Sequence, residues 1–241
     1  MAKYYETKYY SQPTAEELKA RAAESERKAR RKGVVYHPVV VKGRKICTSW
    51  WGTAWCENLE RYADYENRIE RGKRYVRNGS VIDLQIEKGK VHARVQGSRR
   101  TPYKVEIRIS PLSEEKCQTI LDRCGRKLDD LETLLSGEFP DDMKELFFEK
   151  NGLFPSPAEI SLSCSCPDYA IMCKHVAAAL YGVGTRFDED PMLFFELRGV
   201  EVGRFIDVSL KDHVDTLLEH ADNRTSRMMD DADIEKVFGS I

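Results

Sequence analysis

Four side chains of the kinds that ligate soft metal ions lie close together in this sequence. They are Cys164, Cys166, Cys173 and His175, spaced as C-x-C, six intervening residues and C-x-H. Three thiolates and one imidazole form a tetrahedral donor set typical of structural zinc sites, and with all four positions filled none stays open for a catalytic water. The alternative, buried free thiols beside an unrelated histidine, is disfavoured because the four lie so close together. The spacing therefore predicts one structural zinc ion.

The first ligand pair predicts a strand. Side chains two residues apart leave the same face of an extended chain, so Cys164 and Cys166 are expected on a strand that begins at Glu159. Pro167 follows the second cysteine and is expected to end that strand.

The second ligand pair predicts the start of a helix. Two residues apart on a helix, side chains diverge by about 200° and could not share a metal ion. We therefore expect Cys173 just before a helix and His175 in its first turn, with the helix ending at Gly182 or Gly184.

Charge is distributed unevenly along the chain. The net charge of the 241 residues is −1, but residues 1–110 carry 25 Lys and Arg against 13 Asp and Glu, whereas residues 111–241 carry 14 against 27. Such a basic half attracts polyanions, which predicts a nucleic-acid or other acidic partner. In the alternative interpretation, the two halves face each other electrostatically.

Basic residues near loops are the candidates for phosphate contacts. Arg and Lys at such positions bind phosphates without reading sequence, although for any single residue an ordinary solvated charge is the better interpretation. DNA is favoured over RNA as the partner. The candidates precede the expected sheet or follow Gly97: Arg71, Lys73, Arg74, Arg77, Arg99 and Arg100.

Residues 1–40 are expected to form a basic N-terminal arm. Thr14 and Glu17 make a capping-box pattern, which predicts a helix over residues 14–32. Because this segment lacks an apolar stripe, packing is not expected to hold it firmly. It is either a mobile arm that touches phosphates or a solvated extension.

Residues 41–110 are expected to form a helix followed by an antiparallel β-meander. Trp51, Trp55, Leu59 and Tyr62 share one helical stripe, so the two tryptophans are expected in the core. Trp50 points elsewhere and is the candidate for an exposed role.

Three runs that alternate apolar and polar residues make up the meander. Lys88-Gly89 forms a tight turn between the first two runs, and the tryptophan helix is expected to cover their apolar face. The apolar positions are Ile82, Leu84, Ile86, Val91, Ala93, Val95, Val105, Ile107 and Ile109.

The rest of the chain is expected to be helical outside the zinc segment at 159–185. Residues 111–158 form a connector in which Cys117 and Cys124, seven residues apart, are expected to be buried thiols. Residues 186–241 form an acidic region whose helices start at Asp190-Pro191, at Ser209 with Asp212, and from Asp230. The predicted fold class is therefore α+β.

No motif predicts catalysis. The chain lacks a P-loop, a dinucleotide loop, a G-x-S-x-G elbow and an H-E-x-x-H helix. Adjacent acids at Asp129, Asp141 and Asp230 are expected to be helix starts or surface charge, and a metal-dependent nuclease stays an alternative. With no apolar run of about 18 residues and no secretory h-region at the first residues, a cytoplasmic location is expected.

The C-x-C…C-x-H motif, with Pro-Asp after its second cysteine and Lys-His-Val-Ala-Ala-Ala after its third, resembles the SWIM zinc finger. The segments 50–55, 71–81, 95–107 and 193–200 are similar to prokaryotic SWIM-finger proteins. The resemblance implies a β-hairpin and a helix around zinc. It also implies a nucleic-acid-binding accessory protein working beside a Swi/Snf-class helicase, or an adaptor that docks on that helicase without touching nucleic acid.

Overall fold

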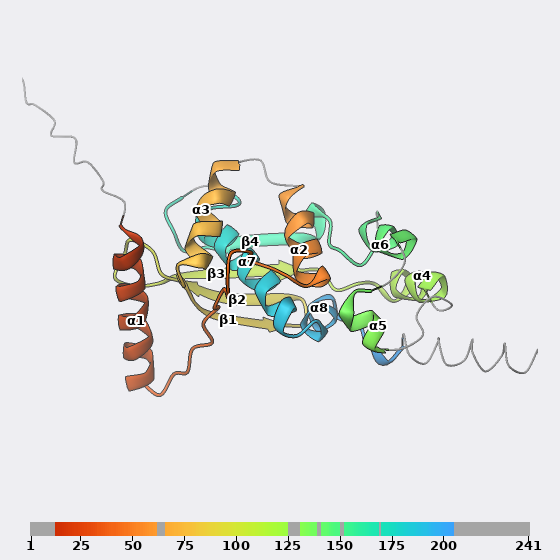
Figure 1. Cartoon of the computed structure of the whole chain (residues 1–241), viewed down its shortest axis with the longest axis horizontal. Helices are drawn as coiled ribbons and strands as arrows, with labels where there is room; N and C mark the ends of the chain where they lie inside the picture. The colour runs from red at the N-terminus through yellow and green to blue at the C-terminus, as the bar shows by residue number, and fades with distance from the viewer. Residues whose placement is uncertain are drawn as a thin grey trace, which may run out of the picture.

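An antiparallel sheet and surrounding helices form the part of the chain that the structure describes (Figure 1). The computed structural model describes residues 13–61, 66–124, 131–138, 141–149, 152–168 and 170–204. Mixed helices and one antiparallel sheet confirm the α+β class. The helices are α1 Ala15–Arg31, α2 Trp50–Glu60, α3 Glu66–Arg77, α4 Glu114–Cys124, α5 Leu131–Ser136, α6 Asp141–Phe148, the 3-10 turn η1 Pro157–Glu159, α7 Lys174–Glu189 and α8 Met192–Arg198.

The sheet has four strands in the order β1-β2-β3-β4, and the expected meander supplies the first three. These are β1 Val81–Glu87, β2 Lys90–Val95 and β3 Tyr103–Ile109, and β1 turns into β2 at Lys88-Gly89 as predicted. In β2 and β3, alternate residues are buried, which matches the predicted apolar face.

The strand of the zinc segment, β4 Ile160–Cys164, is the fourth member of this sheet. It pairs with β3, with Ile107 opposite Leu162. The expected β-hairpin inside the zinc segment is therefore not observed among the described residues. The partner of β4 comes instead from about fifty residues earlier in the chain.

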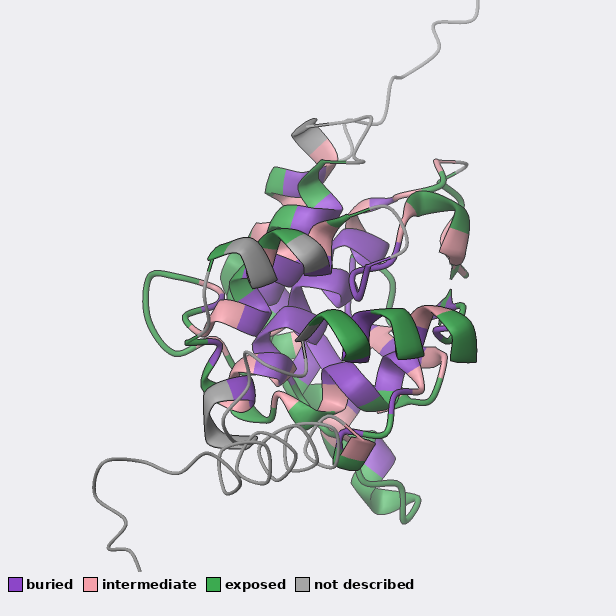
Figure 2. Ribbon diagram, turned by 90° about the vertical axis from the view of Figure 1, so that its right-hand side faces the viewer, coloured by how far each residue is buried: buried purple, intermediate pink, exposed green. Residues whose placement is uncertain are grey.

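Helix α7, and not the tryptophan helix, covers the sheet. It packs on all four strands, while α2 and α3 pack on α7 from outside (Figure 1). Twelve of its residues are buried, and Figure 2 places the buried residues at the centre of the molecule. The prediction that α2 covers the meander was wrong. The apolar run after His175 lies directly on the strands, and the two tryptophans of α2 pack in the same core farther from the sheet.

Helix α7 also runs past both glycines that were expected to end it and reaches Glu189. Neighbouring helices approach it closely at small residues. A Cβ atom built on Gly72 of α3 would lie 2.5 Å from the Cβ of Ala177, well inside van der Waals contact. The small residues of α7 thus set how near α3 can pack.

The tryptophans divide differently from the prediction. Trp51 and Trp55 are fully buried, as expected, and donate hydrogen bonds to the carbonyls of Leu134 (3.0 Å) and Leu180 (2.9 Å). Trp50 is half-buried in an aromatic cluster with Phe147, Phe148 and Phe154, so the exposed role predicted for it was wrong. Tyr62 lies outside the described residues.

Helix α1 begins with the predicted capping box, in which Thr14 and Glu17 exchange side-chain and backbone hydrogen bonds. One face of the helix is buried, which contradicts the expectation that packing does not hold it. The buried positions are Leu18, Ala22, Ser25 and Ala29. This stripe has helical spacing, but its small side chains conceal it in a sequence read for large apolar residues.

A β-bulge between Val81 and Asp83 changes the face of β1. Because of the extra residue, Val81 joins Leu84 in the main hydrophobic core, and Ile82 is buried outside that core. Asp83, a polar position of the first alternating run, is buried and lies 3.5 Å from Arg94.

The connector and the tail are described in part. Cys117 of α4 is buried as predicted, whereas the side chain of Cys124 lies outside the described residues. Helix α8 starts as predicted, with the Met192 N–H bonded to the Asp190 carboxylate at 2.9 Å. The helix starts predicted near Ser209 and Asp230 lie outside the described residues. Within the described ranges, no helix has the length and apolar character needed to cross a bilayer.

Candidate metal centre and basic surface

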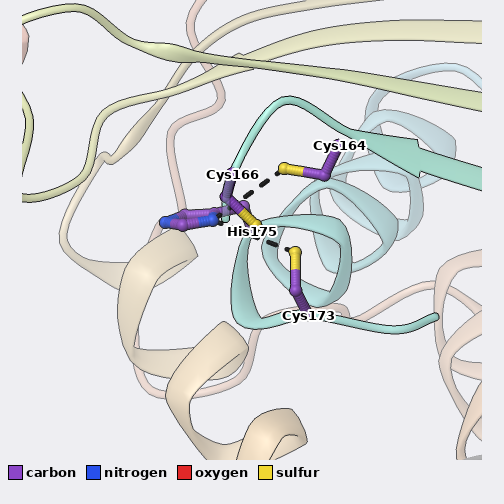
Figure 3. A group of neighbouring side chains, drawn as sticks. All are labelled: Cys164, Cys166, Cys173 and His175. Carbon is purple, nitrogen blue, oxygen red and sulfur yellow. Dashed lines mark hydrogen bonds between the residues drawn. The ribbon is translucent and has the colours of Figure 1, made fainter. Parts of the chain in front are cut away.

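The four predicted ligands converge (Figure 3). One donor atom from each residue lies within 4.8 Å of the other three. His175 Nδ1 is 3.9 Å from the sulfurs of Cys164 and Cys173. Zn–S and Zn–N bonds of about 2.3 and 2.0 Å place tetrahedral ligands roughly 3.5–3.8 Å apart, so a small contraction of the cluster would seat one zinc ion.

The backbone presents these ligands mostly as expected. Cys173 is the N-cap of α7 and His175 lies in the first turn, which confirms the prediction for the second pair. Cys164 is the last residue of β4, but Cys166 lies in the following bend and not on the strand. Ser165 ends the pairing by exchanging hydrogen bonds with Lys104, and the chain then turns Cys166 toward the cluster.

The three thiols differ in acidity. A hydrogen bond from the Cys164 thiol lowers the pKa of Cys173 to about 3, with further help from His175 and the backbone N–H of Val176. The same hydrogen bond raises the pKa of Cys164. Cys173 therefore supplies a ready thiolate, and zinc must displace protons from the other two sulfurs.

The imidazole of His175 is held between two tyrosines. Its ring stacks on Tyr103 at a centroid distance of 4.2 Å and meets the edge of Tyr75 at 5.6 Å. With Nδ1 turned to the sulfurs, Nε2 is buried and makes no hydrogen bond with the described residues. The ring position is thus set by aromatic packing on one side and by the metal ligands on the other.

Each tyrosine also carries a cation over its ring. Arg99 lies over the Tyr103 ring at 5.5 Å, and Lys174 lies over the Tyr75 ring at 5.7 Å. Burial and the neighbouring positive charge of Arg71 lower the pKa of Lys174. The Asp168 carboxylate acts in the opposite direction and partly offsets the like charge of Arg71.

The predicted phosphate contacts therefore fall into two groups. Arg71 and Arg74 act electrostatically on Tyr75, and exposed Arg99 and Arg100 lie in the loop that leads to Tyr103. Tyr75 and Tyr103 both contact the His175 ring, so Arg71, Arg74 and Arg99 lie near this ring together with Lys174, which the sequence did not single out. Arg100 follows Arg99 in the loop and acts on Glu24 of α1. We call Arg71, Arg74, Arg99, Arg100 and Lys174 the basic surface.

Two candidates behave differently. Lys73 pairs with Glu60 at 3.0 Å and with Glu70 at 3.1 Å, so its charge is already neutralised locally. Arg77 is exposed at the end of α3, where it lines a pocket beside α1.

The loop that carries Arg99 is organised by a buried glutamine. The side-chain amide of Gln96 donates to the carbonyls of Gly97 (3.1 Å) and Arg99 (2.7 Å). Its oxygen accepts a hydrogen bond of 2.8 Å from Ser25 of α1. In the sequence, Gln96 is only a polar position of an alternating strand, so its positioning role gave no signal.

Known proteins resemble parts of this chain. Residues 150–183 match the SWIM zinc finger family. Over 158 residues the chain is 40% identical to the uncharacterized protein Rv2102 of Mycobacterium tuberculosis (strain ATCC 25618 / H37Rv), a match that covers 65% of this chain and 57% of that protein. No solved structure matches. The segment is a SWIM zinc finger whose Cys3His cluster is positioned to hold one zinc ion.

Proposed function

We propose that this protein is a zinc-binding, non-catalytic accessory protein that binds nucleic acid, DNA in preference to RNA, through its basic surface. One observation carries the proposal. Tyr75 of α3 and Tyr103, which are far apart in sequence, both pack on the zinc ligand His175, and basic residues accompany each ring: Arg71 and Arg74 act on Tyr75, and Arg99 lies over Tyr103. Clusters of Arg and Lys that project from a rigid base are typical of phosphate-backbone contacts.

Zinc contributes rigidity in this proposal. When bound, it fixes the imidazole of His175 through Nδ1 and supplies no catalytic step. The imidazole in turn supports Tyr103 and Tyr75, and these rings orient Arg99 and Lys174. Phosphate contacts of this kind give affinity without sequence preference, so binding should depend steeply on salt.

A salt titration tests the proposal. Fluorescence anisotropy with labelled duplex and single-stranded DNA, between about 50 and 200 mM salt, gives the slope of log K against log salt. Changing Arg74, Arg99 and Arg100 together to Gln should weaken binding and lower that slope by roughly 2–3 if each contacts one phosphate. The matched control is Arg108→Gln, an exposed arginine five residues beyond Tyr103 on β3.

Two results would contradict the proposal. One is the absence of binding, or a flat salt response, for wild-type protein at low salt. The other is a triple variant that binds like Arg108→Gln. An RNA duplex of the same length in the same assay tests the preference for DNA.

The partnership with a Swi/Snf-class DNA translocase rests on family resemblance alone, and an adaptor is the second candidate. Ile171, in the loop between Cys166 and Cys173, is 80% exposed, and an exposed apolar side chain at the tip of a zinc finger is suited to protein contact. Affinity purification with and without nuclease separates the two functions. A translocase that is retained after nuclease treatment supports the adaptor.

Catalysis has little support from the described acids. Asp141 pairs with Lys144 at 3.0 Å on an exposed helix start, as expected for surface charge. Asp129 and Asp230 lie outside the described residues. We expect no cleavage of DNA incubated with the protein and Mg²⁺, and nicked product would favour the nuclease alternative instead.

A further inference from the structure

Two cysteines outside the metal centre are in direct contact. Cys47 lies just before α2 and Cys56 lies on the second turn of that helix. Their sulfurs are 3.5 Å apart. We propose that this pair is an oxidation site, at which Cys47 and Cys56 form an intramolecular disulfide by exchange with a small-molecule disulfide such as glutathione disulfide.

The backbone on both sides of the pair is fixed. Asp188 of α7 accepts four hydrogen bonds of 2.6–3.1 Å, from the N–H and hydroxyl groups of Thr48 and of Ser49. These bonds hold the chain directly after Cys47, and the helix holds Cys56. A disulfide has an S–S distance of about 2.05 Å, so the sulfurs need to approach by only about 1.5 Å.

A glycine on the central helix makes room for both sulfurs. A Cβ atom built on Gly184 would lie 2.8 Å from the Cys47 sulfur and 2.9 Å from the Cys56 sulfur. Any larger residue would push the two cysteines aside. Gly184 also faces Gly52 of α2, whose own Cβ atom would lie 2.6 Å from the Gly184 carbonyl oxygen, so α2 and α7 cross closely at the point where the two sulfurs meet.

The chemistry proceeds in two exchanges. Cys56 is the more exposed of the two, so its thiolate attacks glutathione disulfide and releases one glutathione thiolate. The Cys47 thiolate then attacks the Cys56 sulfur of the mixed disulfide and releases the second glutathione. Both cysteine protons pass to the two glutathione thiolates. Two electrons pass from the protein to the small disulfide, and the protein gains one S–S bond.

The expected reaction is slow. The hydrogen bond with Cys47, followed by burial, raises the pKa of Cys56, so little thiolate forms at neutral pH. The metal thiolates Cys164, Cys166 and Cys173 are engaged by zinc in the loaded protein, so they do not compete with the pair for glutathione disulfide.

Mass spectrometry of the zinc-loaded full chain tests the site. The protein is incubated with glutathione disulfide, denatured, alkylated and digested with trypsin. Cleavage after Lys45 and Arg61 gives a peptide that holds Cys47 and Cys56 and no other cysteine. We expect this peptide two hydrogens lighter and without alkylation, zinc retained, and a Tm higher by roughly 5 °C that dithiothreitol reverses.

Matched variants complete the test. Cys47→Ala should stop the reaction at a mixed disulfide on Cys56, and Cys117→Ala, which removes a buried thiol elsewhere, should leave the cross-link intact. The inference is overturned if the zinc-loaded wild-type peptide stays fully alkylated, or if both cysteines carry glutathione and do not link. The wild-type result alone decides this, even if a variant fails to fold.

Discussion

Replacing Cys173 by serine separates metal binding from helix capping. Cys173 is 1% exposed and is the N-cap of α7, with φ −76° and ψ 167°. Serine is among the preferred N-cap residues, so the variant keeps a competent cap while it loses a zinc ligand. Any loss of stability can then be assigned to the metal.

The expected loss of stability follows from the share of the zinc-binding free energy that one ligand supplies. Structural zinc contributes roughly 10–16 kcal/mol to the folding of small zinc domains, so one ligand of four accounts for about 2.5–4 kcal/mol. Whole domains are stable by only about 5–15 kcal/mol. At about 2–4 °C per kcal/mol for a chain of this size, the Tm of Cys173→Ser should fall by roughly 10 °C.

The assay combines zinc content with thermal unfolding. Native mass spectrometry should give one zinc ion in the wild type and substoichiometric zinc in Cys173→Ser. Circular dichroism should give a lower Tm in a single transition, because β4 and α7 belong to the same core as the meander. Cys117→Ser, a buried thiol that is not a ligand, should keep zinc and lose much less stability. The reasoning is refuted if Cys173→Ser keeps stoichiometric zinc and the wild-type Tm, or if the finger melts separately from an intact sheet.

Three further variants probe the core, the acid response and the basic loop. Gly72→Ala should lower the free energy of unfolding by about 1–3 kcal/mol, because the added Cβ atom would meet the backbone and a side chain of α7. Gly203→Ala has open space around the added atom and should leave that free energy unchanged. Urea unfolding of both variants measures the difference. Burial would raise the pKa of Glu159, but its hydrogen bonds and the Arg198 guanidinium, 3.1 Å away, hold that pKa below its usual value. A lowered native pKa gives stability that is present above about pH 4.5 and is lost as the pH falls, so the Tm of Glu159→Gln should decline less between about pH 5 and 3 than that of the wild type. Gln96→Ala should weaken DNA binding several-fold in the anisotropy assay while zinc stays bound, and unchanged affinity would show that the loop keeps its shape without the amide.

Features with a local signature were predictable. The zinc ligands lie within one short segment, and the alternation of β2 and β3 is visible in any reading of their residues. The start of α7 followed from the geometry of Cys173 and His175 alone.

Features that depend on distant partners were not predictable. The pairing of β4 with β3 and the position of α7 on the sheet arise from contacts between segments some fifty or more residues apart. The buried stripe of α1 uses Ala and Ser, which carry little hydrophobic signal. The bulge in β1 places Val81, and not Ile82, in the main core, and an alternating sequence pattern does not show where such an extra residue lies.

The basic surface was also not predictable, because its residues come from segments that are far apart in the sequence. Arg74 and Arg99 gave only separate charge signals, and Tyr75 and Tyr103, which both pack on His175, had no distinguishing pattern.

The position of α7 on the sheet has a consequence for synthesis. A ribosome makes β1, β2 and β3 before it makes the strand and helix that complete the core, and roughly fifty residues separate the third strand from the fourth. Until α7 emerges, the apolar face of the nascent meander has no cover, and unprotected strands of this kind are prone to aggregate. Zinc binds late in this sequence, because its ligands flank the junction between β4 and α7. Without zinc this last step is less favourable, so the yield of folded protein in a cell should follow metal supply.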